Sequence, residues 1–452
     1  MRTKRPLAQT ISMGALLPIL FCQGGCAMTH APKWGPSENW DFRFKDFVIG
    51  AWWGPCPSDA EMKVYKEAGF NTVMAGRYMA MADYGNVEKL ERDLEAARKH
   101  GLGAFIDMYT TDERPWGGIP GDPHAKARLP EWWREMGGTG AFQMSANFEQ
   151  FKWLYENFGR HPATIGFLLA DDQAVLTPPL VQMTDFLLAH EPHLMPWICQ
   201  NNFLPKELAK RNNPISSFQT YPTLYQRHKT APDQMQVQCD SFNIIATACE
   251  KHNIAMWPMF DVCGDRSDSL VRFQVYASAA YGADGIWYFC YKTGLTKATR
   301  CREGYTIESM EEMRAELLPE YDAAKEANNR ILRWGDRLLG CVREGIVNTG
   351  YEVKDGKKPG AGTRVAEMDD DLLVGLLTKP GRCLMAMVVD KRVSKKFGEL
   401  APREVRVVFD DSVRKIAPLE GANAVSARAK GNVLEMTLPA GGGQLVELRT
   451  RE

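Results

Sequence analysis

Eight short apolar runs alternate with amphipathic stretches between residues 47 and 333, and few folds are compatible with this rhythm. Apolar runs separated by helices are typical of a parallel sheet that helices cover. The runs occupy residues 47–53, 71–77, 102–110, 164–173, 195–202, 214–222, 254–261 and 285–294. Eight units without a glycine-rich dinucleotide motif predict a (β/α)8 TIM barrel, and a doubly wound open sheet is the alternative.

The rhythm changes after a final helix, which we expect to run from residue 309 to about residue 333. Short alternating strands separated by Gly, Asp, Lys and Pro predict a C-terminal antiparallel β-sandwich. These strands are expected at residues 341–348, 372–379, 383–390, 404–410, 432–439 and 443–449. The predicted organisation is therefore an export signal (1–26), an N-terminal extension (27–46), the barrel (47–338) and the β-sandwich accessory domain (339–452).

The first 26 residues have the order of an export signal. Arg2, Lys4 and Arg5 precede an apolar stretch, which small residues follow. We therefore expect an exported protein: periplasmic, outer-membrane lipoprotein or extracellular. Gly24-Gly25-Cys26 is similar to a bacterial lipobox, which would attach a lipid to Cys26 and so anchor the chain to a membrane. Gln23 stands where that motif prefers an apolar residue, so the sequence leaves lipidation open.

Composition excludes several classes of function. A formal net charge of −1 gives no reason to expect nucleic acid as a partner. The 11 cysteines include no Cys-x-x-Cys pair, so we expect neither a zinc motif nor a disulfide framework, and most should be buried as small apolar side chains. None of the eight histidines lies at a strand end, and no phosphate-binding glycine loop is evident. No metal and no cofactor is therefore expected.

Active sites of such barrels lie at the C-terminal ends of the strands, so the residues that end each run are the candidates. Flat aromatic rings offer faces to sugar C–H groups, while amides, Arg and carboxylates hydrogen-bond to hydroxyls. The sequence therefore predicts a carbohydrate substrate. The candidates are Trp52, Trp53, Arg77, Asp107, Tyr109, Asp171, Asp172, Gln200, Asn201, Asn202, Gln219, Tyr221, Asp261, Trp287, Tyr288, Tyr291 and Lys292.

Four segments resemble the TIM-barrel glycoside hydrolases of clan A, especially secreted bacterial members. "GAWWGPCPSDAEMKVYKEAGFNTVM" is similar to their first strand, helix and second strand, and "YASAAYGADGIWYFCY" to their last helix and strand. "IGFLLADDQ" lies where their fourth strand ends in Asn-Glu-Pro or Asp-Glu-Pro, and "LLVGLLTKPGRCLMAMVVDK" is similar to their β-sandwich domain. The resemblance covers residues 47–452 and implies an exported glycoside hydrolase.

The same resemblance implies roles for three carboxylates. Asp172 takes the place of the acid/base Glu, Asp171 that of its neighbour, and Asp261 is the acid nearest to the nucleophile. The family uses Glu at both catalytic places, and its Pro is replaced by Gln173. Because Asp is shorter by one methylene, we expect a wider gap between the carboxyls and inversion, or a partner such as Asp107. A catalytically inactive glycan-binding barrel is the alternative, and a hydrolase of non-sugar substrates is less favoured.

Overall fold

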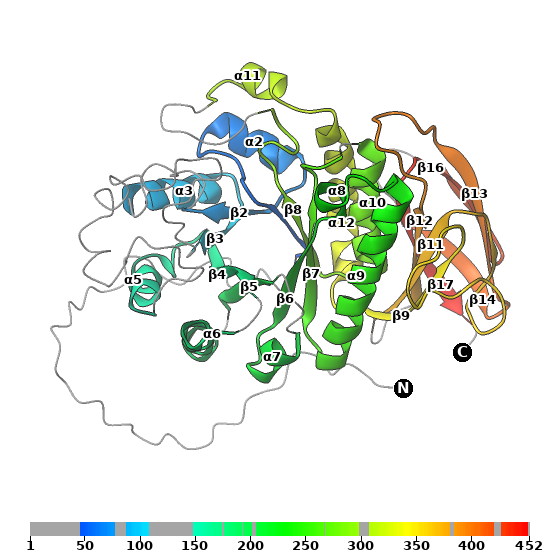
Figure 1. The fold of residues 1–452 in the computed structure, drawn as a ribbon, viewed down its shortest axis with the longest axis horizontal. Helices are drawn as coiled ribbons and strands as arrows, with labels where there is room; N and C mark the ends of the chain where they lie inside the picture. Colours follow the sequence, from blue (N-terminus) through cyan, green and yellow to red (C-terminus); the bar gives the residue numbers. More distant parts are fainter. Residues whose placement is uncertain are drawn as a thin grey trace.

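The computed structural model describes residues 46–76, 87–107, 148–173, 176–191, 193–200, 205–265, 267–297, 307–379, 384–419 and 426–450. Eight parallel strands form one sheet in the order β1-β8-β7-β6-β5-β4-β3-β2, which confirms the predicted TIM barrel (Figure 1). The strands are β1 (Val48–Ala51), β2 (Thr72–Ala75), β3 (Gly103–Asp107), β4 (Thr164–Gln173), β5 (Met195–Gln200), β6 (Ile215–Thr220), β7 (Ala255–Asp261) and β8 (Gly285–Phe289).

Side chains bridge β1 and β2 and so close the barrel. The Asn71 side-chain oxygen accepts a hydrogen bond from the Ile49 backbone amide at 2.8 Å, and the Asn71 backbone amide donates to the Ile49 carbonyl at 3.0 Å. The Tyr65 hydroxyl accepts from the Ala51 amide and donates to the Thr72 carbonyl. The backbone groups at this junction are therefore paired, as buried polar groups must be.

Tryptophans fill the barrel interior. The rings of Trp197 and Trp287 lie with their centroids 4.1 Å apart, and Phe105 packs edge-on against both. Gly50 leaves space for the Trp287 ring, since a Cβ at this position would come within 2.4 Å of the ring. Because the interior is packed with side chains, the functional groups must lie at one end of the barrel.

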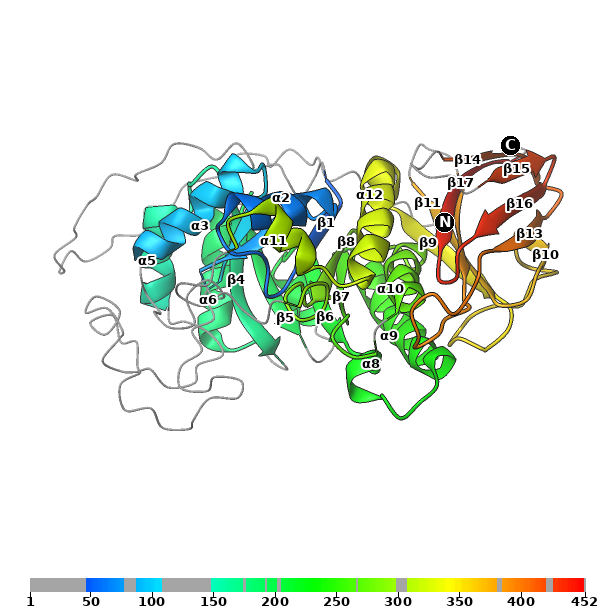
Figure 2. The ribbon, with the colours of Figure 1, turned by 90° about the horizontal axis from the view of Figure 1, so that it is seen from above.

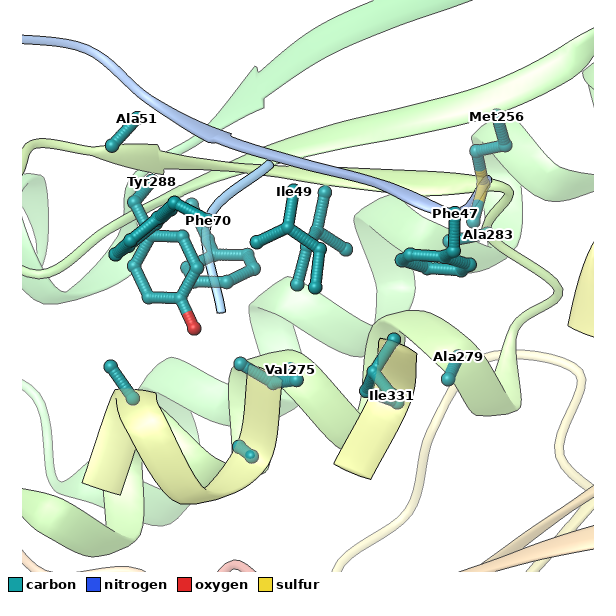
Figure 3. Packing of buried hydrophobic residues seen from close by; sticks show 14 of the residues in the cluster. Phe47, Ile49, Ala51, Phe70, Met256, Val275, Ala279, Ala283, Tyr288 and Ile331 are labelled. Carbon is teal, nitrogen blue, oxygen red and sulfur yellow. The ribbon is translucent and has the colours of Figure 1, made fainter. Parts of the chain in front are cut away.

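Helices cover the outside of the barrel. Phe47 and Ile49 of the first strand region pack with Val275 and Ala279 of α10 and Ile331 of α12 (Figure 3). The helices are α2 (Asp59–Glu67), α3 (Val87–Lys99), α5 (Phe148–Phe158), α6 (Pro178–His190), α7 (Pro205–Lys210), α8 (Pro222–Tyr225), α9 (Ala231–His252), α10 (Asp268–Ala280), α11 (Met310–Ala315) and α12 (Glu320–Leu338).

The predicted helix over residues 309–333 is two helices. Pro319 is the N-cap of α12, and α11 ends before it, because proline lacks the N–H that a continuous helix needs at that position. The helix α12 then continues to Leu338, five residues beyond the predicted end.

The C-terminal residues form two antiparallel sheets, which confirms the predicted β-sandwich. One sheet has the order β10-β13-β16-β15 and the other β14-β17-β12-β11-β9. The strands are β9 (Val342–Asn348), β10 (Val365–Met368), β11 (Leu372–Thr378), β12 (Leu384–Asp390), β13 (Arg403–Phe409), β14 (Val413–Pro418), β15 (Ala427–Lys430), β16 (Val433–Leu438) and β17 (Gly443–Thr450). The sequence did not predict β10, β14 and β15, which are short or carry several charges.

Helices α10 and α12 lie between the barrel and the sandwich (Figures 1 and 2). Arg330 of α12 is buried there, donates to the Gln444 side chain at 2.6 Å and lies over the Trp334 ring at 4.9 Å. The backbones also approach closely, since a Cβ at Gly375 would lie 2.1 Å from the Ala280 carbonyl oxygen. The two domains therefore share a packed interface.

Candidate active site

Three carboxylates and one side-chain amide lie at or near the C-terminal ends of four strands and face the barrel axis. Successive strand residues point to opposite faces, so Asp107 continues the inward row of Phe105, and Asp261 that of Met259. Gln219 of β6 occupies an inward position by the same alternation, and its contact with Asp171 places that carboxylate on the same side. These four residues, on β3, β4, β6 and β7, form the candidate active site.

Asp171 is held by a hydrogen bond that spans the barrel end. The Gln219 amide nitrogen donates to Asp171 Oδ1 at 2.9 Å and lies 3.5 Å from the Cys199 sulfur of the strand between them. Asp171 is buried, so this partner offsets part of the cost of removing a polar group from water. The contact fixes one acid of the "ADDQ" segment at the mouth of the barrel.

Asp261 at the end of β7 is fully buried. The Thr223 hydroxyl donates to its Oδ2, whereas Oδ1 has no hydrogen-bond partner among the described residues. Burial raises the pKa of this carboxyl to about 7, and nearby Cys263 adds to the rise, while the Thr223 hydrogen bond opposes it. A carboxyl with such a pKa holds a proton in a large part of the molecules at neutral pH, as a general acid requires.

Aromatic rings lead from the barrel mouth to the surface. The Phe289 ring lies 5.4 Å from Trp53 and 4.9 Å, stacked, from Tyr221. Tyr221 in turn lies 5.9 Å from Tyr225, which is 70% exposed. We call these four residues the aromatic row. Its central ring, Phe289, ends β8 directly opposite Asp261 of β7.

Four predicted sugar-binding residues lie elsewhere. Trp52 and Trp287 are buried in the packed barrel interior. Gln200 is fully buried on the opposite face of β5 from Cys199, and donates to Ser216 Oγ at 3.1 Å. The Tyr288 hydroxyl points toward the helices and donates to Asn328 of α12 at 2.7 Å (Figure 3). Gln200 and Tyr288 thus occupy the outward faces of their strands, and Trp52 and Trp287 are packed inside the barrel. A residue's position at a strand end does not tell which face it occupies.

Several predicted residues lie outside the described part of the chain: the export signal and the N-terminal extension up to residue 45, and Arg77, Tyr109, Asn201 and Asn202. Asp172 belongs to β4, next to Asp171, and its side chain is not among those described. Its predicted role as the acid/base therefore stays a prediction.

Some contacts of the candidate residues have no signal in the sequence, because they form only when distant segments meet in the fold. Lys292, which was predicted at a strand end, forms a buried ion pair with Glu61 of α2, with Nζ 2.5 Å from Oε2. Tyr291, the residue before it, is buried beneath Phe70 and Tyr65. Thr223, the partner of Asp261, follows the Tyr-Pro that ends the sixth run, which was the one available signal.

Cys56 forms a disulfide. The other cysteines of the described ranges are buried, except Cys263, which is half-buried. In the described ranges, no group of three His, Cys, Asp or Glu residues is arranged to hold a metal ion. The helices of those ranges include none with the length and apolarity of a membrane span.

Two solved structures have a similar architecture. A protein described as a glycoside hydrolase is 12% identical to this chain over 89% of its length and 92% of that protein's, with a TM-score of 0.50. A glycoside hydrolase family 5 protein from Bacteroides vulgatus ATCC 8482 is also 12% identical, over 89% of both chains, with a TM-score of 0.50. No family model and no curated protein matches the sequence. The chain thus has the fold of the TIM-barrel glycoside hydrolases that carry a C-terminal β-sandwich.

Proposed function

We propose that this chain is an exported glycoside hydrolase that cleaves glycosidic bonds of a poly- or oligosaccharide by carboxylate acid/base catalysis. The observation that carries the proposal is Asp261: a buried carboxyl with a raised pKa and one oxygen without a hydrogen-bond partner in the described chain, at the catalytic end of a barrel. The similarity in fold to glycoside hydrolases supports the same class of reaction.

In the proposed reaction, Asp261 donates its proton to the oxygen of the bond that breaks. Asp172, the second carboxylate of the β4 pair, acts on the sugar carbon, either directly or through a water that it deprotonates. Gln219 orients this pair through Asp171. The raised pKa thus favours Asp261 as the acid, in place of the nucleophile that the resemblance implies.

We expect Asp172→Asn to abolish turnover and to preserve ligand binding. An amide has nearly the same size as the carboxylate, but it neither accepts a proton nor attacks carbon. Initial rates on aryl glycosides, together with the rise in melting temperature caused by an oligosaccharide, measure the two properties separately. If the wild type shows the thermal shift and no turnover, the inactive glycan-binding barrel is the correct function. The full burial of Asp261 is the observation that favours this second function.

The aromatic row predicts that the substrate has several sugar units. We expect Tyr225→Ala to raise KM for a long oligosaccharide by about 3- to 10-fold, the loss of one stacking contact of roughly 1 kcal/mol. The KM for a short aryl glycoside should not change, because such a substrate ends before it reaches Tyr225. Ile244→Ala is the control, since Ile244 is an exposed apolar residue of α9 outside the row. Equal KM changes for long and short substrates would contradict this role.

Export is supported by the Cys56 disulfide, because structural disulfides persist in oxidising compartments. The order of residues in the N-terminal segment supports export, and a lipid on Cys26 stays a prediction. Cell fractionation, with mass analysis of the mature N-terminus, checks both. An unprocessed chain in the cytoplasm would contradict them.

A further inference from the structure

Two cysteines meet at the ends of β7 and β8, beside the candidate active site. Cys263 follows β7 by two residues, and Cys290 comes directly after β8. Their Sγ atoms are 3.0 Å apart, and the Cys290 amide donates to the Cys263 sulfur at 3.2 Å. The hydrogen bond from the Val262 amide to the Phe289 carbonyl, at 2.8 Å, holds the two strand ends together. A disulfide needs the sulfurs at about 2.05 Å, so a shift of about 1 Å joins them.

We propose that Cys263 and Cys290 form a disulfide that cross-links the strand ends carrying Asp261 and Phe289. The disulfide at Cys56 supports folding in a compartment that supplies an oxidant. The two sulfurs also share a polar neighbour, the Thr293 hydroxyl, at 3.6 and 3.4 Å. This contact holds both side chains on the same side of the β8 end.

The reaction is thiol–disulfide exchange with a low-molecular-weight or protein disulfide as the oxidant. Cys263 is half-buried and Cys290 fully buried, so the Cys263 thiolate attacks the external disulfide first. One external thiolate leaves, and a mixed disulfide forms on Cys263. The Cys290 thiolate then attacks the Cys263 sulfur and expels the second external thiolate. The two cysteines lose two protons and two electrons, and the oxidant is reduced to two thiols.

The bond would act on the active site in two ways. It would fix the distance between the strand ends that carry the proposed acid and the centre of the aromatic row. It would also remove the Cys263 thiol, whose charge adds to the rise in the pKa of Asp261, whereas burial, the larger cause of that rise, would remain.

Peptide mapping tests the proposal directly. Trypsin places the two cysteines in separate peptides, residues 252–266 and 273–292, each with a single cysteine. The full-length protein is equilibrated with reduced and oxidised glutathione, unfolded, alkylated and digested without reductant. We expect the two peptides to appear cross-linked, two hydrogens lighter than their sum, and to separate after reduction. Alkylation or glutathionylation of both cysteines in most molecules would overturn the proposal.

Matched variants give a second measurement. We expect Cys263→Ser/Cys290→Ser to lower the melting temperature in the same buffer by about 5 °C, as loss of a cross-link over a loop of this size predicts. Cys249→Ser, which removes a buried thiol of α9, should leave the cross-linked peptide intact. A double variant as stable as the wild type, together with unlinked peptides in the wild type, would exclude the bond.

Discussion

Asp261→Asn is expected to lower kcat by about 10²- to 10⁴-fold, the usual contribution of a general acid. The amide keeps the size of the carboxyl and still accepts the Thr223 hydrogen bond, but it has no proton to donate. An aryl glycoside whose leaving group needs no protonation should recover most of its rate in this variant. The same substrate should not rescue Asp172→Asn, since the step at carbon remains blocked.

The pKa of Asp261 also gives the sign of two pH effects. Activity should fall as the pH rises through about 7, because the carboxyl loses its proton. In the unfolded chain the pKa returns to about 3.9, so the folded state binds more protons between about pH 4 and 7. Stability contributed by the protonated group is therefore full below about pH 4 and is lost as the pH rises to 7. At pH 8 Asp261→Asn should be more stable than the wild type by about 2 to 4 kcal/mol.

Asp265→Asn is the matched control for both effects. Asp265 lies in the same loop, but its carboxylate pairs with Lys395 of the sandwich domain at 2.8 Å. We expect near-normal kcat and no gain in stability. An Asp261→Asn protein with wild-type kcat, measured beside this control over pH 5 to 9, would show that Asp261 is not the acid.

Glu61→Gln is expected to lower the free energy of unfolding by about 3 to 5 kcal/mol, as removal of one partner from a buried ion pair does. The Glu61 Oε2 accepts from Lys292 Nζ at 2.5 Å and from the Cys56 amide at 2.9 Å. Its Oε1 accepts from the Ile307 amide at 3.3 Å. Glutamine offers one oxygen instead of two and turns an N–H group toward these donors, so the Lys292 ammonium stays buried without a counter-charge.

Two further variants isolate the cause. Adding Lys292→Met to Glu61→Gln should recover part of the stability, because the unpaired charge is gone. Glu67→Gln, on the same helix, removes a partly exposed pair with Arg314 and should cost less than about 1 kcal/mol. Denaturant unfolding curves give all three values. If Glu61→Gln costs no more than Glu67→Gln, the buried pair does not hold α2 against the end of β8.

The barrel strands were predictable because each one is buried on both faces and therefore reads as a continuous apolar run. For the same reason, the sequence does not show whether the residue that ends a run faces the barrel interior or the surrounding helices. Gln200 was a strand-end candidate and its neighbour Cys199 was not, yet Cys199 faces the barrel and Gln200 the helices. In β4, the pairing with β5 shifts register between Leu168 and Ala170 and again before Gln173, so alternation counted along the sequence fails there.

Contacts between distant segments had no local signal. Glu61 reads as a residue of an amphipathic helix, and its partner Lys292 lies 231 positions away. Thr223 and Asp261 belong to different strand–helix units, so their hydrogen bond appears only once β6 and β7 are adjacent. The sequence therefore predicted the end of the barrel where the site lies, whereas the partners of each carboxylate depend on the folded chain.

Product release from a panel of polysaccharides, oligosaccharides and aryl glycosides tests the central claim most directly. We expect the wild type to release sugar from at least one substrate class. From substrates with poor leaving groups, Asp261→Asn should release it at least about 100-fold more slowly and Asp172→Asn not at all. Asp265→Asn should match the wild type. If the wild type releases no sugar from any substrate while oligosaccharides still raise its melting temperature, the claim of hydrolysis is wrong and the barrel binds glycans without cleaving them.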